Sequence, residues 1–390
     1  MKRAVSGRLR PDLFFSVAQD GPVLRSDRPL AQEGPVTQDR PLLRPAVLRR
    51  LHAYLASLLS EGFPPSVSLA VVQPGGVVLE AFGGWACTVD ETVATTAGTR
   101  YDLASLTKVV CTTTLALMAR ERRALALEDP VVRWLPGYPQ ARTTLWHLLT
   151  HTSGLIDHVP FYATAAGRAP IEAALYAEAS SSEPGEMVRY SDLNFMLLGW
   201  ALEACLGRSL DEAFAVEVAA PLGLQHTQFR PSLADRRRTA ATELDGDQRL
   251  GPGLVWGEVH DGNAYALGGV AGHAGLFAPL GDLARFVQVL LAPGAGRLLS
   301  ASSVALMSTR QGSTVGDVRG LGWRLEPENW GPWPPGTVWH TGFTGTSLLV
   351  APALGTGVVL LTNSVHPHRR LDDQATMRTK IHRLVAEALS

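Results

Sequence analysis

Residues 101–108 read YDLASLTK, and the apolar segment VVCTTTLALM follows directly at 109–118. Ser105 and Lys108 lie three residues apart where a helix is expected to begin, so their side chains share one face with Cβ atoms roughly 5–6 Å apart. The helix has almost no polar side, which is typical of a helix buried in a core. We therefore expect the lysine amine to reach the serine hydroxyl where water is scarce.

This spacing predicts a serine nucleophile with its own base. Burial disfavours the ammonium form, so we expect the pKa of Lys108 to be lowered and the amine to accept the proton of Ser105. The first turn of a helix leaves N–H groups unpaired, and the Ser105 N–H is expected to point at an oxyanion. Ser-x-x-Lys pairs also arise by chance, and serines near helix starts are often caps, so the rest of the chain must decide.

Length and composition exclude several classes of protein. The chain has 390 residues, which favours two lobes over one. Hydrophobic residues make up 46% and charged residues 18%, an ordinary globular composition that excludes wholesale disorder. The 35 basic and 36 acidic residues nearly balance, so no nucleic-acid partner is indicated.

The cysteines and the N-terminus bear on location. Cys87, Cys111 and Cys205 are far apart, which indicates neither a disulfide framework nor a zinc site. Pro11-Asp12 interrupts the basic N-terminus where a signal peptide carries an apolar segment, and no segment is long enough to span a membrane. We expect a cytoplasmic protein, or a periplasmic or cell-envelope protein if the N-terminus is wrongly assigned.

Hydrophobic periodicity places strands at both ends of the chain and helices between them. Residues 1–45 are rich in proline and are expected to form an extended arm. A helix is expected at 47–59 and a hairpin at 66–82, then helices and loops without strands from 125 to 291, including a helix at 282–291. Strands are expected again at 322–325, 347–351 and 357–363. A final helix is expected at 374–389.

This order predicts an α/β fold of the α+β type. One antiparallel sheet is expected from the N- and C-terminal segments, with helices flanking it and a mostly helical lobe inserted. We assign residues 46–104 and 292–390 to the sheet lobe and residues 105–291 to the helical lobe.

Two further motifs follow the serine motif along the chain. Tyr190-Ser191-Asp192 precedes a helical segment, and His340-Thr341-Gly342 precedes the strand at 347–351. With Ser-x-x-Lys, these resemble the serine β-lactamases of class C and the related D-alanyl-D-alanine carboxypeptidases, which carry Ser-x-x-Lys, Tyr-x-Asn and Lys/His-Thr-Gly in that order. Residues 148–155, 268–277 and 320–323 match as well, and the resemblance covers the chain from about residue 47 to its end.

The resemblance implies a β-lactamase/transpeptidase-like fold and a role for each motif. Ser105 attacks a carbonyl carbon and is acylated, Lys108 and Tyr190 share the proton transfers, and the N–H groups of Ser105 and Phe343 form the oxyanion hole. A protonated His340 faces the carboxylate of a small-molecule or peptide substrate, and no metal or cofactor is implied. The residues expected to contact substrate are Asp192, His340, Thr341 and Gly342.

Two departures from the family pattern bear on the substrate. Asp192 replaces the asparagine of Tyr-x-Asn, which brings a negative charge next to Lys108 and removes an amide donor. His340 stands where class C β-lactamases usually have lysine. The sequence therefore indicates a serine hydrolase that cleaves β-lactams or D-alanyl peptides through a Ser105 acyl-enzyme, and both departures favour a peptidase or esterase relative. A promiscuous carboxylesterase and a catalytically retired peptidoglycan-binding or scaffold protein stay open, as do the choice of base and the oligomeric state.

Other patterns in the sequence carry less weight than these motifs. His147 and His151 have the spacing of a helical metal pair, but no glutamate follows His147, so a structural role is favoured. The glycine-rich segment 268–275 lacks a phosphate-binding pattern, and no Gly-x-Ser-x-Gly occurs.

Overall fold

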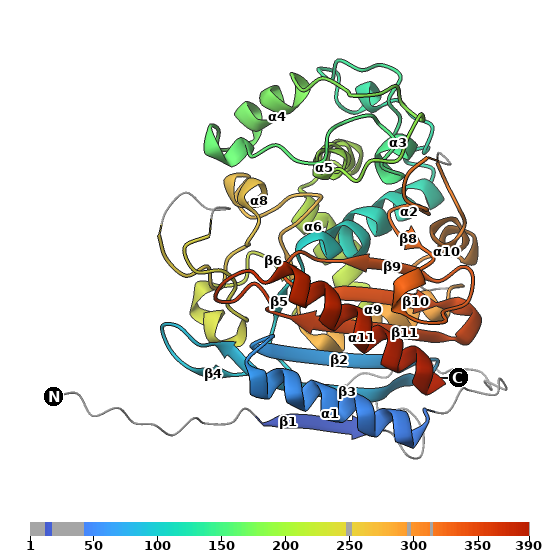
Figure 1. Ribbon diagram of the computed structural model, residues 1–390. Coiled ribbons are helices and arrows are strands. Elements are labelled where there is room, and N and C mark those ends of the chain that lie inside the picture. Colours follow the sequence, from blue (N-terminus) through green and yellow to red (C-terminus); the bar gives the residue numbers. More distant parts are fainter. Residues whose placement is uncertain (1–11, 18–42, 247–251, 295–297, 313–314, 390) are drawn as a thin grey trace.

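The fold is built on one antiparallel sheet with helices on both faces (Figure 1). The computed structural model describes residues 12–17, 43–246, 252–294, 298–312 and 315–389. Most of the arm expected at residues 1–45 lies outside these described residues.

The main sheet joins the two ends of the chain. Strand β2, from the N-terminal half, pairs with β11, the last strand, so segments nearly 300 residues apart are neighbours, as the sequence predicts. Strand β4 (Val93–Ala94) pairs with β3 beside the main path. In spatial order the other strands are β1 (Leu13–Val17), β3 (Gly76–Cys87), β2 (Ser66–Gln73), β11 (Thr356–Thr362), β10 (Ser347–Ala351), β9 (Val338–Thr341) and β8 (Arg324–Leu325).

The central strands are covered on both faces, which explains their unbroken apolar sequences. Strands β2, β10 and β11 are buried along their whole length. Helices α1 (Pro45–Glu61) and α11 (Leu371–Leu389) pack together on one face, and α9 (Leu280–Leu291) covers the other (Figure 1). Residues 280–291, assigned from sequence to the helical lobe, thus belong with the sheet.

The inserted region is mostly helical, as expected. Helix α5 carries an almost continuous apolar sequence and is buried nearly all round. The α-helices here and before β8 are α2 (Thr114–Glu121), α3 (Leu145–Leu149), α4 (Arg168–Tyr176), α5 (Asp192–Leu206), α6 (Leu210–Phe214), α7 (Ala220–Leu222), α8 (Gly262–Ala266) and α10 (Ala301–Ser308). The 3₁₀ helices are Ala104–Leu106, Val131–Arg133, Phe161–Ala163, Leu233–Arg238, Glu328–Trp330 and Pro352–Leu354, and the π-helices are Lys108–Thr113 and Ala215–Ala219.

The structure also has short strands, within and just before the inserted region, that the sequence did not predict. A small second sheet has the order β5 (Tyr101–Asp102), β7 (Leu276–Ala278) and β6 (Gln228–Phe229). Strands of two or three residues are too short to show a period in the sequence. This small sheet matters for the site, because β5 leads directly into the Ser105 turn.

The N-terminal arm contributes β1, which pairs with β3 at the sheet edge. Leu13, Phe15 and Val17 point to the α1 side and pack against the apolar cluster there, whereas Phe14 stacks on Phe82 at 4.7 Å between ring centroids. Among the described residues, no helix is long and apolar enough to cross a membrane.

Candidate active site

The turn that carries Ser105 is held in a strained conformation. Ala104, directly before Ser105, has a φ of 46°, which a residue with a Cβ rarely adopts. The buried carboxylate of Asp102 accepts hydrogen bonds from the N–H of Ala104 (2.8 Å) and the N–H of His260 (2.6 Å). These two hydrogen bonds connect the turn to the loop that contains His260, and so they help to fix the position of Ser105.

Lys108 reaches Ser105, as its spacing predicts. The fully buried Nζ donates to Ser105 Oγ at 2.9 Å, to Asp192 Oδ1 at 2.7 Å and to the carbonyl of His273 at 3.1 Å. Lys108 opens a π-helix rather than the α-helix expected from sequence. Its three hydrogens therefore have three acceptors, one of which is the candidate nucleophile.

The charge of Lys108 differs from the expectation. Burial pulls its pKa down, but the negative charge of Asp192 and the interaction with Tyr190 outweigh burial, so the pKa lies above its usual value. The prediction of a lowered lysine pKa is therefore wrong. The reason is Asp192, whose own pKa is lowered, because the ion pair with Lys108 and a bond to His158 outweigh its burial. Lys108 holds its proton in the resting site.

His158 is a member of the site that the sequence did not reveal. Its Nδ1 lies 3.6 Å from Asp192 Oδ2, and its side chain is 33% exposed. The bond to Asp192 raises the pKa of His158 against the effect of its partial burial. Asp192 thus stands between a buried ammonium and a half-exposed histidine, and no motif contains His158.

Tyr190 is positioned by His151. The N–H of Arg189 donates to the His151 carbonyl at 2.8 Å, and the N–H of Ser191 donates to His151 Nδ1 at 3.1 Å. The His151 ring also lies against the Tyr190 ring, with 4.7 Å between centroids. The structural role of His151 is therefore to position Tyr190, because it accepts hydrogen bonds from the residues on both sides of it.

Cations surround the Tyr190 ring. Lys108 Nζ lies 5.1 Å from the ring centroid, and Cζ of Arg319 lies 5.2 Å from it. The ring of His340 is farther away, with 6.0 Å between centroids. Ser105 and Lys108 come from one segment and Tyr190 and His340 from two others, and the structure brings all four into one site.

His340 is buried and neutral. Nδ1 lies 3.0 Å from the Thr341 carbonyl, so Nδ1 carries the proton and donates it. Burial and the charges of Lys108, Arg319 and Arg324 hold its pKa well below the usual value. The expected imidazolium is therefore wrong, because the surrounding cations and the loss of water both oppose a second proton.

The turn between β9 and β10 lies against the Ser105 turn. The hydroxyl of Thr344 donates to the Asp102 carbonyl at 2.7 Å, and that of Thr346 donates to the Leu103 carbonyl at 3.1 Å. A Cβ at Gly342 would lie 2.4 Å from the Leu103 carbonyl oxygen, so glycine is required for this approach. Phe343 is carried on this turn next to the Ser105 segment. Its role in an oxyanion hole stays a prediction, as do substrate contacts by Thr341 and Gly342.

The other histidines serve loops and helix ends. His147 accepts the N–H of Thr144 at 3.0 Å and caps α3, so it is not paired with His151. His260 and His273 bond Glu243 at 2.9 Å and Asp261 at 2.8 Å. Within the described residues, no group of three or more histidine, cysteine or acidic side chains is arranged to hold a metal ion.

Comparison with known proteins identifies the family. Residues 52–381 match the family model described as Beta-lactamase. The chain belongs to the beta-lactamase family. All three motif segments of this site lie inside the matched range, and the antiparallel sheet with its helical region is the beta-lactamase/transpeptidase-like fold.

Curated relatives within the beta-lactamase family are of similar length. A protein of Escherichia coli K12 named "Putative D-alanyl-D-alanine carboxypeptidase" is 31% identical over 365 residues, covering 82% of each chain. A protein of the same name from Salmonella paratyphi B is 30% identical over 369 residues, covering 82% of this chain and 83% of the relative.

Solved structures of the beta-lactamase fold are more distant in sequence. The hydrolase EstCE1, described as having promiscuous acyltransferase activity, has a TM-score of 0.71 and 23% identity, covering 88% of this chain and 98% of its own. A class C beta-lactamase has a TM-score of 0.68 and 20% identity, covering 86% of this chain and 95% of its own. At these identities the likeness establishes the fold.

Proposed function

We propose that this protein is a serine hydrolase that cleaves D-alanyl peptides, and related amides and esters, through an acyl-enzyme on Ser105. The observation that carries the proposal is the bridge made by the buried Lys108 ammonium, 2.9 Å from Ser105 Oγ and 2.7 Å from Asp192. A site that had lost its chemistry would have no need for a buried charge at its serine, because burying a charge is costly unless the charge is used or paired.

In the proposed mechanism Tyr190 is the base. Lys108 already holds its proton, so it cannot take one from Ser105, and its ammonium lies 5.1 Å from the centre of the Tyr190 ring, close enough to stabilise negative charge during the proton transfer. Ser105 Oγ attacks the carbonyl carbon while its proton passes to Tyr190, which then returns the proton to the leaving group. The N–H groups of Ser105 and Phe343 hold the oxyanion. Water then attacks the acyl carbon and gives a proton to Tyr190, which passes a proton to Ser105 Oγ as the ester bond breaks and the acid leaves.

The D-alanyl substrate class is supported by the relatives of at least 30% identity, which carry the carboxypeptidase name. Asp192 argues against efficient β-lactam turnover, because its carboxylate donates no hydrogen bond where the family pattern has an amide.

A carboxylesterase is the second candidate, and neutral His340 favours it. An uncharged imidazole gives a substrate carboxylate a weaker partner than an ammonium or imidazolium would. Substrates without a carboxylate lose nothing at such a site. The two candidates therefore differ in whether a free carboxylate on the substrate helps or hinders.

Turnover of matched substrates tests the proposal. The set is an N-acyl-D-alanyl-D-alanine peptide, the same peptide with a C-terminal amide, a p-nitrophenyl butyrate ester and a chromogenic cephalosporin. The proposal expects peptide cleavage that Ser105→Ala abolishes, with the cephalosporin turned over least. Ester cleavage with the amide peptide preferred over the free peptide supports the esterase. Wild-type protein inactive on all four, or activity that survives Ser105→Ala, contradicts both.

A further inference from the structure

We propose that Arg319 is a positioning residue that supplies the positive charge needed by Tyr190, in the role that a lysine in place of His340 would otherwise fill. This inference rests on the proposed function, because it assigns the support of the base in that mechanism. It arises from a guanidinium that the sequence did not single out and that no motif contains.

Arg319 is buried without enough partners. Its side chain is 0% exposed, and Cζ lies 5.2 Å from the Tyr190 ring centroid. Nη2 donates to Asp317 Oδ2 at 3.0 Å, but within the described residues Nε and Nη1, both buried, have no hydrogen-bond partner. A buried guanidinium is costly unless its donors are paired, so this arrangement needs a purpose other than stability.

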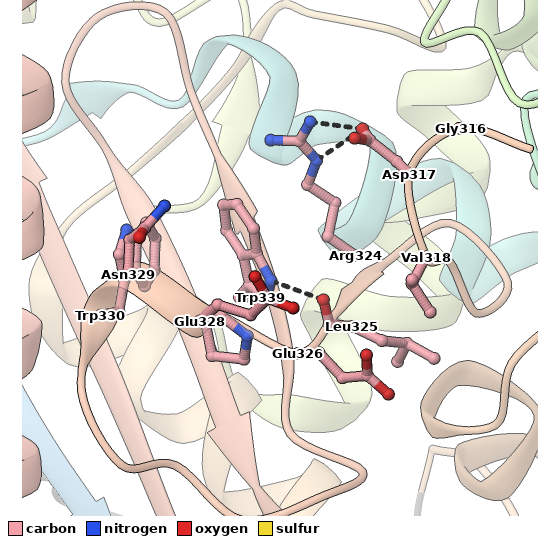
Figure 2. Close-up of a pocket in the computed structure, with 11 residues that line it drawn as sticks. Gly316, Asp317, Val318, Arg324, Leu325, Glu326, Glu328, Asn329, Trp330 and Trp339 are labelled. Carbon is pink, nitrogen blue, oxygen red and sulfur yellow. Dashed lines mark hydrogen bonds and ion pairs between the residues drawn. The ribbon is translucent and has the colours of Figure 1, made fainter.

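Among the described residues Arg319 pairs with the carboxylate of Asp317, which it shares with a second arginine. Asp317 also accepts from Nε of Arg324 at 3.1 Å and from Nη2 of the same side chain, and Figure 2 shows these two bonds. Arg324 is 34% exposed at the edge of a cavity of about 370 Å³ and lies over Trp339, whereas the Arg319 side chain is fully buried. Two guanidiniums and one carboxylate leave one positive charge in excess, and the Tyr190 ring lies next to the buried guanidinium.

The other groups that face Tyr190 supply less of this charge. The positive charge of Lys108 is offset by the carboxylate of Asp192, whose Oδ1 lies 2.7 Å from Lys108 Nζ. His151 and His340 are neutral, because burial and the neighbouring cations lower the pKa of each well below its usual value. Burial also lowers the pKa of Arg319, to about 10, which leaves it charged at neutral pH. Arg319 is thus the cation at Tyr190 whose charge is least compensated.

The pH dependence of kcat/KM for p-nitrophenyl butyrate tests this role, since the neutral ester does not titrate. If Tyr190 must be anionic, Arg319→Met should move the acid limb up by about one pH unit and lower kcat/KM below it about tenfold, with KM unchanged. Arg319→Lys should restore most of the wild-type profile. Asp317→Asn removes the compensating carboxylate, so its acid limb should move to lower pH.

The matched control is Arg50→Met, which removes one charge from the exposed side chain on α1, on the other face of the sheet. Its acid limb should stay in place. An acid limb unmoved in Arg319→Met, or moved in the same direction by Asp317→Asn, overturns the inference. If Arg319→Met does not fold, Asp317→Asn decides: a shift to lower pH supports the role, and no shift overturns it.

Labelling of Ser105 by a serine-directed phosphonate separates this inference from the proposed function. A labelled wild type with unmoved acid limbs refutes the role of Arg319 alone. A wild type that takes no label and hydrolyses no ester refutes the proposed function, and the role of Arg319 with it.

Discussion

At the scale of single residues, the charge of Lys108 depends on two opposed effects. Burial favours the neutral amine, and a carboxylate 2.7 Å away favours the ammonium. The ion pair has the larger effect, so the pKa of Lys108 is raised. The charged amine also has acceptors in Ser105 and the His273 carbonyl, so each of its hydrogens is bonded. For this reason the proposed mechanism assigns the role of base to Tyr190 and not to Lys108.

Tyr190→Phe tests that assignment. The substitution keeps the ring between His151 and Arg319 and removes only the hydroxyl, so the site should keep its shape. A lost proton-transfer group should lower kcat by about 10²–10⁴-fold. Steady-state kinetics on the ester measure this, with thermal unfolding as a check on the fold. A loss below tenfold would assign the proton transfer elsewhere.

Asp192→Asn tests the ion pair. Without the carboxylate, burial dominates at Lys108 and its pKa should fall. Since the proposed mechanism needs the ammonium, the alkaline limb of kcat/KM should move down by about one pH unit or more. The same variant restores the amide of the family pattern and should acylate faster with a cephalosporin. An alkaline limb at its wild-type position would mean that Asp192 does not set the charge of Lys108.

The sequence reveals the site residues that have motifs, and it misses those that do not. Ser105, Lys108, Tyr190 and His340 lie in short patterns, and the structure brings them together. Their charges depend on neighbours that are distant in sequence, which is why the predicted states of Lys108 and His340 were wrong. Arg319 entered the site only through the fold, because a lone arginine carries no pattern.

At the scale of elements, the site depends on how the β9–β10 turn is held against the Ser105 turn. The hydroxyls of Thr344 and Thr346 bond the β9–β10 turn to the segment before Ser105. Side chains of α11 bond the same turn from its other side. The Gln374 amide donates to the Phe343 carbonyl at 2.9 Å, and Arg378 donates to the Gly342 carbonyl at 3.1 Å. The C-terminal helix thus positions an active-site turn, which its sequence does not indicate.

Gly342→Ala tests this contact between elements. A Cβ there would lie 2.1 Å from Thr346 Oγ1 and 2.4 Å from the Leu103 carbonyl oxygen, so one turn must move. We expect a loss of about 1–3 kcal/mol in the free energy of unfolding and at least about a tenfold drop in kcat. The control is Gly281→Ala in α9, where nothing lies within 4 Å. Equal activity of the two variants would show that the turn is not held tightly.

Long periodic elements are predictable from sequence, and short ones are not. The helix expected at 47–59 is α1, and the strands expected at 347–351 and 357–363 are β10 and β11 within one residue. Strands β5, β6 and β7 were missed, because two or three residues carry no period. The helix at 282–291 was predicted, but its apolar face does not say that it covers the sheet.

At the scale of the whole molecule, the buried histidines make stability depend on pH. His151, His340 and His382 lie in the interior with lowered pKa values, that of His382 falling to about 3, chiefly through burial. Such groups stay neutral when folded and take protons when unfolded. Stability is therefore lost as the pH falls below their unfolded value of about 6.5.

Urea unfolding at pH 7.5 and pH 5.0 measures this effect. Each of the three histidines should lower the free energy of unfolding by about 2 kcal/mol at pH 5.0, an upper estimate that His158 partly offsets because its pKa is raised. The Asp192 carboxylate adds a further loss only below about pH 4, because its folded pKa is lowered. Replacing His382 with asparagine should flatten the slope. Equal stability at both pH values would mean that these histidines bind protons in the folded state.

Intact-protein mass spectrometry after exposure to a serine-directed phosphonate shows whether Ser105 is a nucleophile. We predict one added phosphonyl group in the wild type, mapped by peptide digestion to the segment containing Ser105 and absent from Ser105→Ala. Arg50→Met should be labelled like the wild type. An unlabelled wild type, or a label that persists in Ser105→Ala, would contradict the account.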